Sequence, residues 1–346
     1  MTDSFIDLDT TKMPDLSWRV AKIPKKSGGL RTLHIPNDEL KSVQRQVLQY
    51  LYQFKTLRPR MSVVGFVPGR DTMSGLVQHD IMAMFVICMD VKDFFDNCNT
   101  AHAARELLLA GVPATKVDYI MKVCTYNGSF AQGAPSSPYL ANIAMTRFDA
   151  YMHAYAARRG LTYTRYADDI AIAENTAADT HIMRHGDRYY RMVGKHVVRN
   201  QGTVYRAIRG IEKLLSLVSE GKLEVNRKKT RVAWRVGGQA SRRITGVVMR
   251  NDALGYNAPR KMRKLARAMC HNLYMRMQDP EAKARYKDYV SDWRQLKGYV
   301  TYCDRIRKHS NCADCATEDP FVSTAKYVAL KTIFEKKGDI NDSRNS

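Results

Sequence analysis

The fold of this chain is decided by the stretch Arg165-Tyr166-Ala167-Asp168-Asp169-Ile170-Ala171-Ile172. Residues on both sides of the two aspartates alternate as they do in β-strands, so the pattern predicts a strand, a tight turn and a second strand. Asp168 and Asp169 then lie at the tip, where each carboxylate must be solvated, hydrogen-bonded or bound to a cation. An ordinary acidic turn is the alternative, because aspartate is common in turns.

A third aspartate favours a functional site over an ordinary turn. The apolar run Phe85-Val86-Ile87-Cys88-Met89 is typical of a strand that is buried on both faces, and Asp90 follows it directly. A carboxylate at the end of a buried strand is again unfavourable without a partner. If Asp90, Asp168 and Asp169 lie side by side, their oxygens suit Mg²⁺, and they suit two ions when triphosphate oxygens share the coordination.

Together, the two elements resemble the palm of reverse transcriptases. The resemblance implies that the three aspartates hold two Mg²⁺ ions, with the main-chain carbonyl of Val91 completing one shell. It also implies that Tyr166 and Ala167 contact the primer and template. Phe95, five residues after Asp90, matches the bulky residue that lies under the 2′ position of the nucleotide in this family. A core aromatic is the alternative for Phe95.

A further motif lies between the two acidic elements, in the order of the family. The segment Gln132-Gly133-Ala134-Pro135-Ser136-Ser137-Pro138 is close to the family's Gln-Gly-x-Pro-x-Ser-Pro. Gly133 allows a close backbone approach to a base pair, and the two prolines stiffen a loop that leads into a helix. The resemblance implies that Gln132 and Gly133 line the pocket for the nucleotide and template.

Residues 19–36 predict two short strands joined by a glycine-rich turn. The resemblance identifies them as the fingers hairpin, whose basic residues hold the incoming triphosphate; a solvated basic turn is the alternative. Arg31 fits this role best, because a guanidinium fork matches phosphate oxygens. Lys25 or Lys26 supplies a second cation, and the sequence does not decide between them.

More of the family pattern follows the acidic hairpin. Residues 223–230 resemble the next motif, in which Lys229 matches a lysine that protonates or neutralises the leaving pyrophosphate; a solvated charge is the alternative. Thr245 and Gly246 lie in a segment that resembles the primer-gripping hairpin. Pro259 opens a basic amphipathic helix that resembles the thumb and is expected to contact phosphates. Its predicted apolar face is Met262, Leu265, Met269 and Leu273. The cations assigned to that contact are Arg260, Arg263 and Arg267.

The composition agrees with a nucleic-acid partner. The 346 residues carry 56 Lys and Arg against 34 Asp and Glu, and the formal net charge of +22 indicates a polyanionic partner. The sequence shows neither a signal peptide nor an apolar segment long enough to span a bilayer. The seven cysteines do not resemble a disulfide framework and fit a reducing compartment. We therefore expect a cytoplasmic protein.

Two features lie outside the family pattern. A basic insertion at about residues 176–210 has cations at helical spacing, and it is either a solvated basic helix or an RNA-binding element. The cations assigned to RNA binding are Arg184, Arg188, Arg191 and Lys195. Near the C-terminus, four residues have a pattern that a single zinc ion could use, and an ordinary His-containing loop is the alternative. These four are Cys303, His309, Cys312 and Cys315.

The motifs predict an α+β right-hand polymerase with fingers at 1–84, a palm of antiparallel sheet and helices at 85–250, and a helical thumb and tail at 251–346. The resemblance is strongest to retron reverse transcriptases. Retron enzymes usually carry an Asn-Ala-x-x-His box. In this chain Gly75-Leu76 stands in place of Asn-Ala, and only His79 matches the box. The family implies an enzyme that uses dNTPs to copy a structured non-coding RNA into msDNA-like DNA, with an effector protein, in anti-phage defence.

Two alternatives stay open at this stage. The chain is a bacterial defence reverse transcriptase of a non-retron kind, or it is an RNA–DNA-binding scaffold that restrains a toxic effector. Three clustered carboxylates favour an active enzyme, because a scaffold has no use for them. No membrane partner is expected, and the sequence leaves a homo-oligomer open.

Overall fold

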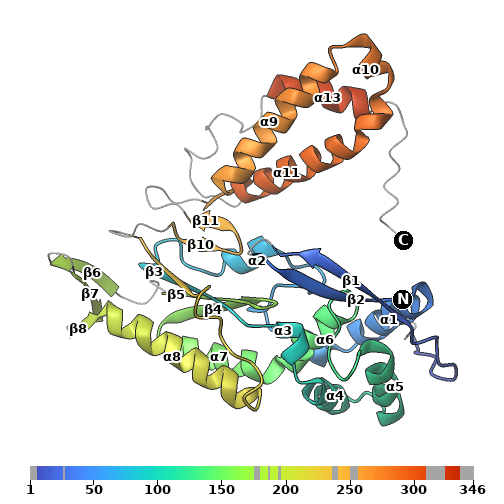
Figure 1. The fold of residues 1–346 in the computed structure, drawn as a ribbon. Helices are drawn as coiled ribbons and strands as arrows, with labels where there is room; N and C mark the ends of the chain where they lie inside the picture. Colours follow the sequence, from blue (N-terminus) through green and yellow to red (C-terminus); the bar gives the residue numbers. More distant parts are fainter. Residues whose placement is uncertain are drawn as a thin grey trace, which may run out of the picture. The chain divides into compact units, whose positions relative to one another are not determined.

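The computed structural model describes residues 6–25, 28–174, 180–185, 188–193, 196–235, 241–249, 256–308 and 324–335. The chain divides into two compact units, Met1–Gly237 and Gly238–Ser346. Both contain strands and helices, so the fold is α+β (Figure 1). The predicted division into fingers, palm and thumb stays a prediction.

A four-stranded antiparallel sheet with the order β4-β5-β3-β9 organises the first unit. The strands are β4 (Leu161–Tyr166), β5 (Asp169–Glu174), β3 (Phe85–Asp90) and β9 (Arg231–Trp234). β3 lies inside the sheet, and its apolar residues are almost all buried, which confirms the predicted buried strand. The sheet therefore ends in Asp90 on one strand and in an acidic turn on the neighbouring hairpin.

Two helices cover one face of this sheet (Figure 1). Helix α7 (Thr146–Ala157) packs against β4, and α8 (Asn200–Val218) packs against α7. The buried positions of α8 recur every three or four residues, as expected of an amphipathic helix. They are Val204, Ala207, Ile211 and Leu215. Helix α6 (Ser137–Ala144), which precedes α7, is buried along most of its length.

The N-terminal part forms the predicted hairpin and helix. Strands β1 (Trp18–Pro24) and β2 (Leu30–Pro36) pair antiparallel. Helix α1 (Asp38–Tyr52) begins where the Asn37 side chain accepts a hydrogen bond from the Leu40 N–H. Its buried face packs against α5 (Ala114–Cys124). The short elements of this unit are η1 (Lys55–Leu57), α2 (Thr72–Leu76), α3 (Phe94–Asn97) and α4 (Thr100–Leu109).

The basic insertion forms strands, so the predicted helical face of cations is wrong. β6 (Thr180–His185), β7 (Arg188–Val193) and β8 (His196–Arg199) make a three-stranded antiparallel sheet before α8 begins. The segment is rich in β-branched and aromatic residues, which favour strands, and a strand repeats every two residues instead of every 3.6. Arg184, Arg188 and Arg191 lie on β6 and β7, whereas Lys195 lies outside the described residues.

The second unit joins a small sheet to a helical group. The sheet contains β10 (Arg243–Ile244), β11 (Val247–Met249) and β12 (Tyr256–Asn257). The helices are α9 (Arg260–Arg276), α10 (Pro280–Ala284), η2 (Tyr286–Tyr289), α11 (Val290–Lys308) and α13 (Thr324–Glu335). Helix α9 begins after Pro259 as predicted and packs against α11 and α13. Its core face is Ala266, Cys270 and Leu273, while Leu265, which the sequence places on that face, is 44% exposed.

The predicted zinc site is not tested by the described residues. Cys303 is buried within α11, and burial raises the pKa of its thiol to about 11, so the thiol is protonated at neutral pH. His309, Cys312 and Cys315 lie outside the described residues.

Of the helices in the described ranges, none is both long and apolar enough to cross a membrane.

Candidate functional site

The acidic turn closes the hairpin of β4 and β5. The strand register ends with Tyr166 opposite Asp169, which leaves Ala167 and Asp168 as a two-residue turn. Ala167 has a φ of 53°, in the left-handed region that is uncommon for a residue with a Cβ. The strand, turn and strand predicted for this stretch are therefore confirmed.

Strand β3 brings the third aspartate to the same end of the sheet. Asp90 is the register partner of Asp169, and the Val91 N–H donates to the Asp168 carbonyl at 3.0 Å. Directly opposed residues of antiparallel strands share a face, so Tyr166, Asp169 and Asp90 form one row across β4, β5 and β3. The structure thus brings the predicted acids together, and their roles in catalysis stay predictions.

The surroundings of the turn disfavour two charged aspartates. Desolvation, with repulsion from Asp168 and Asp90, raises the pKa of Asp169 to about 6. Desolvation and repulsion from Asp90 also raise the pKa of Asp168, while Lys229 and Arg31 oppose that rise. Any further cation bound among these carboxylates would favour their charged forms. The electrostatics are those of a site that attracts positive charge.

The donor set is made of oxygens, which suit a hard divalent cation such as Mg²⁺. As the described side chains stand, no group of three or more His, Cys, Asp or Glu residues is arranged to hold a metal ion. Asp90 instead accepts hydrogen bonds from the Lys229 Nζ at 2.9 and 3.0 Å. The ammonium group thus supplies the positive charge beside this carboxylate.

Main-chain hydrogen bonds hold the segment that carries Lys229 against the end of β3. The Asn226 N–H donates to the Asp90 carbonyl at 2.7 Å, and the Lys92 N–H donates to the Glu224 carbonyl at 2.9 Å. Lys229 lies in the turn that follows, where its own N–H donates to the Asn226 carbonyl. The sequence motif at 223–230 is therefore placed next to the acids, as the resemblance implies.

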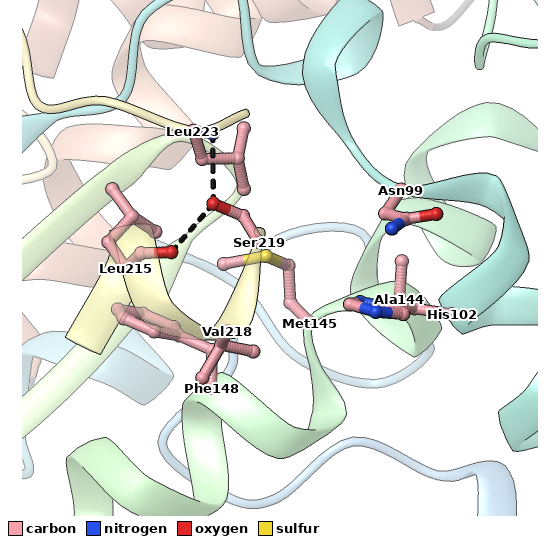
Figure 2. Close-up of a pocket in the computed structure, with 9 residues that line it drawn as sticks. All are labelled: Asn99, His102, Ala144, Met145, Phe148, Leu215, Val218, Ser219 and Leu223. Atoms are coloured by element: carbon pink, nitrogen blue, oxygen red, sulfur yellow. Dashed lines mark hydrogen bonds between the residues drawn. The ribbon is translucent and has the colours of Figure 1, made fainter. Parts of the chain in front are cut away.

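This segment leaves the end of α8 at a fixed corner. The Ser219 hydroxyl donates to the Leu215 carbonyl at 2.7 Å and accepts from the Leu223 N–H at 2.9 Å (Figure 2). The cavity beside it measures about 10 Å³, which has room for at most one water. The corner therefore orients the chain that leads to Lys229 and is too small to hold a ligand.

A buried polar cluster lies beneath the acidic turn. Arg165 is fully buried and donates to the Asp149 carboxylate through Nε and Nη2 at 2.9 and 2.7 Å. Asp149 also accepts from the Tyr163 hydroxyl at 2.6 Å. Arg165 Nη1 donates to the Asn142 Oδ1 at 3.0 Å and to the Ala167 carbonyl at 2.9 Å. We call these four side chains, Arg165, Asp149, Tyr163 and Asn142, the floor; they tie the turn to α6 and α7.

His79 is a second buried contact that the sequence did not explain. Its Nε2 lies 2.7 Å from the Thr164 Oγ1 on β4, and the residue is 2% exposed. Burial lowers the pKa of His79 to about 3, so the ring is neutral at physiological pH. His79 therefore supports the hairpin from behind.

The fingers hairpin presents two of the predicted cations in different places. The charge of Arg31 lowers the pKa of Asp168, whereas the charge of Lys25 acts on Asp96. Arg31 is therefore the cation of this pair whose charge is felt at the acidic turn. Lys26 lies outside the described residues.

The Gln132-Gly133 motif contacts the same hairpin. The His34 N–H donates to the Gln132 carbonyl at 2.9 Å. Gly133 has a φ of 117°, and a Cβ there would lie 3.1 Å from the His34 carbonyl oxygen. Glycine is thus required here by the backbone conformation and by the contact with β2, while its predicted contact with a base pair stays a prediction.

Phe95 is half-buried on α3 with its ring 5.4 Å from that of Phe94, and its role as a sugar gate stays a prediction.

The predicted primer hairpin and thumb cations belong to the second unit. Thr245 and Gly246 form the two-residue turn between β10 and β11, and both have positive φ, at 46° and 89°. On α9, Arg260 and Arg267 are exposed and Arg263 is half-buried. Their contacts with nucleic acid stay predictions.

A comparison with known families identifies this arrangement. Residues 23–250 match the family described as reverse transcriptase (RNA-dependent DNA polymerase). The chain belongs to the reverse transcriptase family. The matched residues contain the acidic turn, β3, the segment that carries Lys229 and most of the fingers hairpin.

Individual relatives within the reverse transcriptase family confirm the predicted resemblance to retron enzymes. The retron Mx65 reverse transcriptase of Myxococcus xanthus is 32% identical over 292 residues, which are 77% of this chain and 58% of that protein. The retron Ec86 reverse transcriptase of Escherichia coli is 26% identical over 305 residues, 85% of this chain and 82% of that protein. The chain thus spans less than two thirds of the Mx65 protein and most of the Ec86 protein.

Among solved structures, telomerases are similar to this chain at a low level. The Candida albicans enzyme in complex with a fragment of telomeric RNA gives a TM-score of 0.47 at 11% identity, covering 93% of this chain and 62% of that one. A truncated apo telomerase from Candida tropicalis gives 0.44 at 14% identity, covering 66% and 52%. Membership of the reverse transcriptase family rests on the sequence match, because these structural similarities are weak.

Proposed function

We propose that this protein is an RNA-directed DNA polymerase that extends a primer on an RNA template. The observation that carries the proposal is the meeting of Asp90, Asp168 and Asp169 at one end of the sheet, in a chain of the reverse transcriptase family. The raised pKa values of the two turn aspartates support it, because carboxylates whose pKa values are raised by their neighbours are typical of functional sites.

The three aspartates, with the Val91 carbonyl, are the groups that would hold two Mg²⁺ ions. When bound, the ions would activate the primer 3′-hydroxyl and neutralise charge on the triphosphate. The chain's own contribution is to fix the oxygens in place, through the strand register of Asp90 with Asp169 and the Val91–Asp168 hydrogen bond. Because these bonds fix the backbone positions of the aspartates, binding the ions requires rotation of the side chains and the release of Lys229 from Asp90.

Two cations complete the proposed site. Lys229, which pairs with Asp90, is released from that carboxylate when another cation takes its place, and its ammonium then neutralises or protonates the leaving pyrophosphate. Arg31, whose charge reaches Asp168, binds phosphate oxygens through its guanidinium fork. Both residues lie in segments that the family match includes.

The relatives support a proposal for the substrate and the biological setting. Since the relatives are retron reverse transcriptases, we propose that the template is a structured non-coding RNA and the product an msDNA-like DNA made from dNTPs. An effector protein and a role in anti-phage defence belong to the same proposal. The net charge of +22 supports a large nucleic-acid partner.

Primer extension tests the activity, and sequencing tests the substrate. The purified protein should extend a DNA primer on an RNA template in the presence of Mg²⁺ and dNTPs, and EDTA should abolish extension. Nucleic acid that copurifies with the protein should contain one structured RNA and complementary DNA. Absence of extension by folded protein would contradict the polymerase and favour an RNA–DNA-binding scaffold. Extension with no defined RNA would favour a reverse transcriptase of a non-retron kind.

A further inference from the structure

The segment that precedes α2 is hydrogen-bonded to the outer side of β4 in the acidic hairpin. The Arg165 N–H donates to the Ser62 carbonyl at 2.8 Å, and the Val64 N–H donates to the Arg165 carbonyl at 2.9 Å. Val63 forms a parallel bridge with Arg165. The chain at 62–64 therefore runs alongside β4 and delivers the next two residues to the tip of the hairpin.

The first of these residues touches the turn itself. A Cβ at Gly65 would lie 2.8 Å from the Ala167 nitrogen and 3.0 Å from the Tyr166 ring, so only glycine fits without a shift of the backbone. The Asn142 side chain, part of the floor, donates to the Gly65 carbonyl at 2.8 Å. The position of Gly65 is therefore fixed from two sides.

The second residue, Phe66, has an unfavourable backbone conformation. Its φ of 58° lies in the left-handed region, which is unfavourable for a bulky side chain. The residue is 47% exposed, so its apolar surface is only partly buried in return. The ring centroid lies 5.7 Å from that of Tyr166, and the planes are tilted by 52°. Strained residues of this kind concentrate at ligand sites.

The place of Phe66 in the sheet suggests what it contacts. Its ring lies beside the ring of Tyr166, and Tyr166 ends the row that continues through Asp169 to Asp90. One end of the row is therefore aromatic and the other is acidic. At the acidic end, Lys229 pairs with Asp90, and under the proposed function the metal ions held there would bind the triphosphate. Exposed aromatic rings instead stack on bases or contact sugars of a nucleic acid.

We infer that Phe66, together with Tyr166, is a binding subsite for a base or sugar at the end of the primer–template duplex. The inference rests on the proposed polymerase function, because it takes the acidic end of the row as the place of nucleotide addition. Phe66 binds and orients the end of the duplex, while the aspartates carry the chemistry. The hydrogen bonds of residues 62–64 to Arg165 and of Asn142 to Gly65 keep Phe66 beside the turn in spite of its unfavourable φ.

Four proteins test this subsite: wild type, Phe66→Ala, Phe66→Tyr and the control Tyr151→Ala. Tyr151 is an aromatic residue of α7 with a similar exposure of 50%. Binding of a fluorescent RNA–DNA primer–template would be measured by anisotropy, and extension would give kcat and separate KM values for primer–template and dNTP. Melting temperatures would report on folding.

We expect Phe66→Ala to weaken primer–template binding about fivefold to twentyfold, near the lower end of the effect of one base–aromatic stack because the ring is half exposed. Its KM for primer–template should rise by a similar factor, with the KM for dNTP and the melting temperature unchanged. Phe66→Tyr should restore binding, and Tyr151→Ala should behave as wild type.

Three results would overturn the subsite. Equal binding and extension by wild type and Phe66→Ala would show that the ring makes no contact with the duplex. A rise only in the KM for dNTP would move the contact to the nucleotide. A large drop in melting temperature with the loss of binding would make Phe66 a folding residue. If wild type fails to extend, the polymerase proposal fails, while the anisotropy comparison still decides the subsite.

Discussion

The floor and the acidic turn both contain aspartate carboxylates, but the surroundings of these carboxylates differ. In the floor, Asp149 is 2% exposed, and Arg165 and Tyr163 donate three hydrogen bonds to its carboxylate. Burial alone would lower the pKa of Arg165, but Asp149 raises it above its ordinary value. The buried pair is therefore charged and satisfied within the chain.

At the turn, by contrast, desolvation raises the pKa values of Asp168 and Asp169, and repulsion from the neighbouring carboxylates, including Asp90, raises them further. Under the proposed function, we expect the turn to bind an external cation and the floor to support the turn. Substitutions that change the charge of a side chain but little of its volume can separate cation binding by the turn from structural support by the floor.

The largest effect is expected from Asp168→Asn at the turn. This change removes a negative charge from the acidic cluster but almost no volume, so primer extension should fall by on the order of 10³-fold or more. The melting temperature should stay within a few degrees of wild type or rise, because a repelling charge is lost. Extension at the wild-type rate would contradict the role assigned to the turn.

The same change in the floor, Asp149→Asn, should act through stability. It leaves the buried Arg165 without its carboxylate partner, and breaking a buried ion pair costs about 3–5 kcal/mol of unfolding free energy. Denaturant unfolding would measure this loss, with Asp168→Asn as the matched control. If Asp149→Asn is as stable as wild type, the floor is not a structural support and the comparison fails.

These two aspartates also show what the sequence could reveal. The Asp168-Asp169 pair was recognisable because it interrupts an alternating β pattern, and Asp90 because it ends an apolar run. Asp149 is a single acid in the first turn of α7, and nothing local indicates that it meets Arg165. The contact of Gly65 with Ala167 and that of His79 with Thr164 also join segments far apart in the sequence, so no periodicity could predict them.

Where local patterns competed, the sequence was also misleading. The spacing of the cations in the insertion indicated a helix, but the β-branched and aromatic residues between them form strands β6, β7 and β8. On α9, the helix and its start after Pro259 were predicted correctly, while the buried face was displaced to Ala266 and Cys270. Charge spacing is a weak guide, because exposed charges tolerate either periodicity.

A smaller effect is expected where the floor and the turn meet, from Gly65→Ala. The added Cβ would lie 2.8 Å from the Ala167 nitrogen, which is backbone and has to shift. A displacement of the turn by a fraction of an ångström to 1 Å should lower kcat by about 10- to 100-fold, with a loss of about 1–3 kcal/mol in stability. Steady-state extension and denaturant unfolding would measure both.

The control for that substitution is Gly202→Ala on α8, where the nearest neighbour of a new Cβ is the Arg206 side chain at 3.6 Å. Alanine is a better helix former than glycine, so this variant should keep full activity and equal or exceed wild type in stability. Equal activity of both alanine variants would mean that the segment at Gly65 does not position the turn.

The smallest effect is a dependence of stability on pH that comes from Asp169. Its folded pKa of about 6 lies above the ordinary value of 3.8, so between these values the folded chain binds a proton that the unfolded chain has released. The unfolding free energy in EDTA should therefore fall as pH rises from about 4 to 6, by less than about 1 kcal/mol because the residue is solvent-exposed. Asp169→Asn should lack this component, so the difference between the two unfolding free energies isolates it. Mg²⁺ should reverse the trend in wild type above pH 6, since a bound cation favours the charged carboxylate. An identical pH profile for wild type and Asp169→Asn in EDTA would show that the turn carries no uncompensated charge, and the contrast with the floor would be lost.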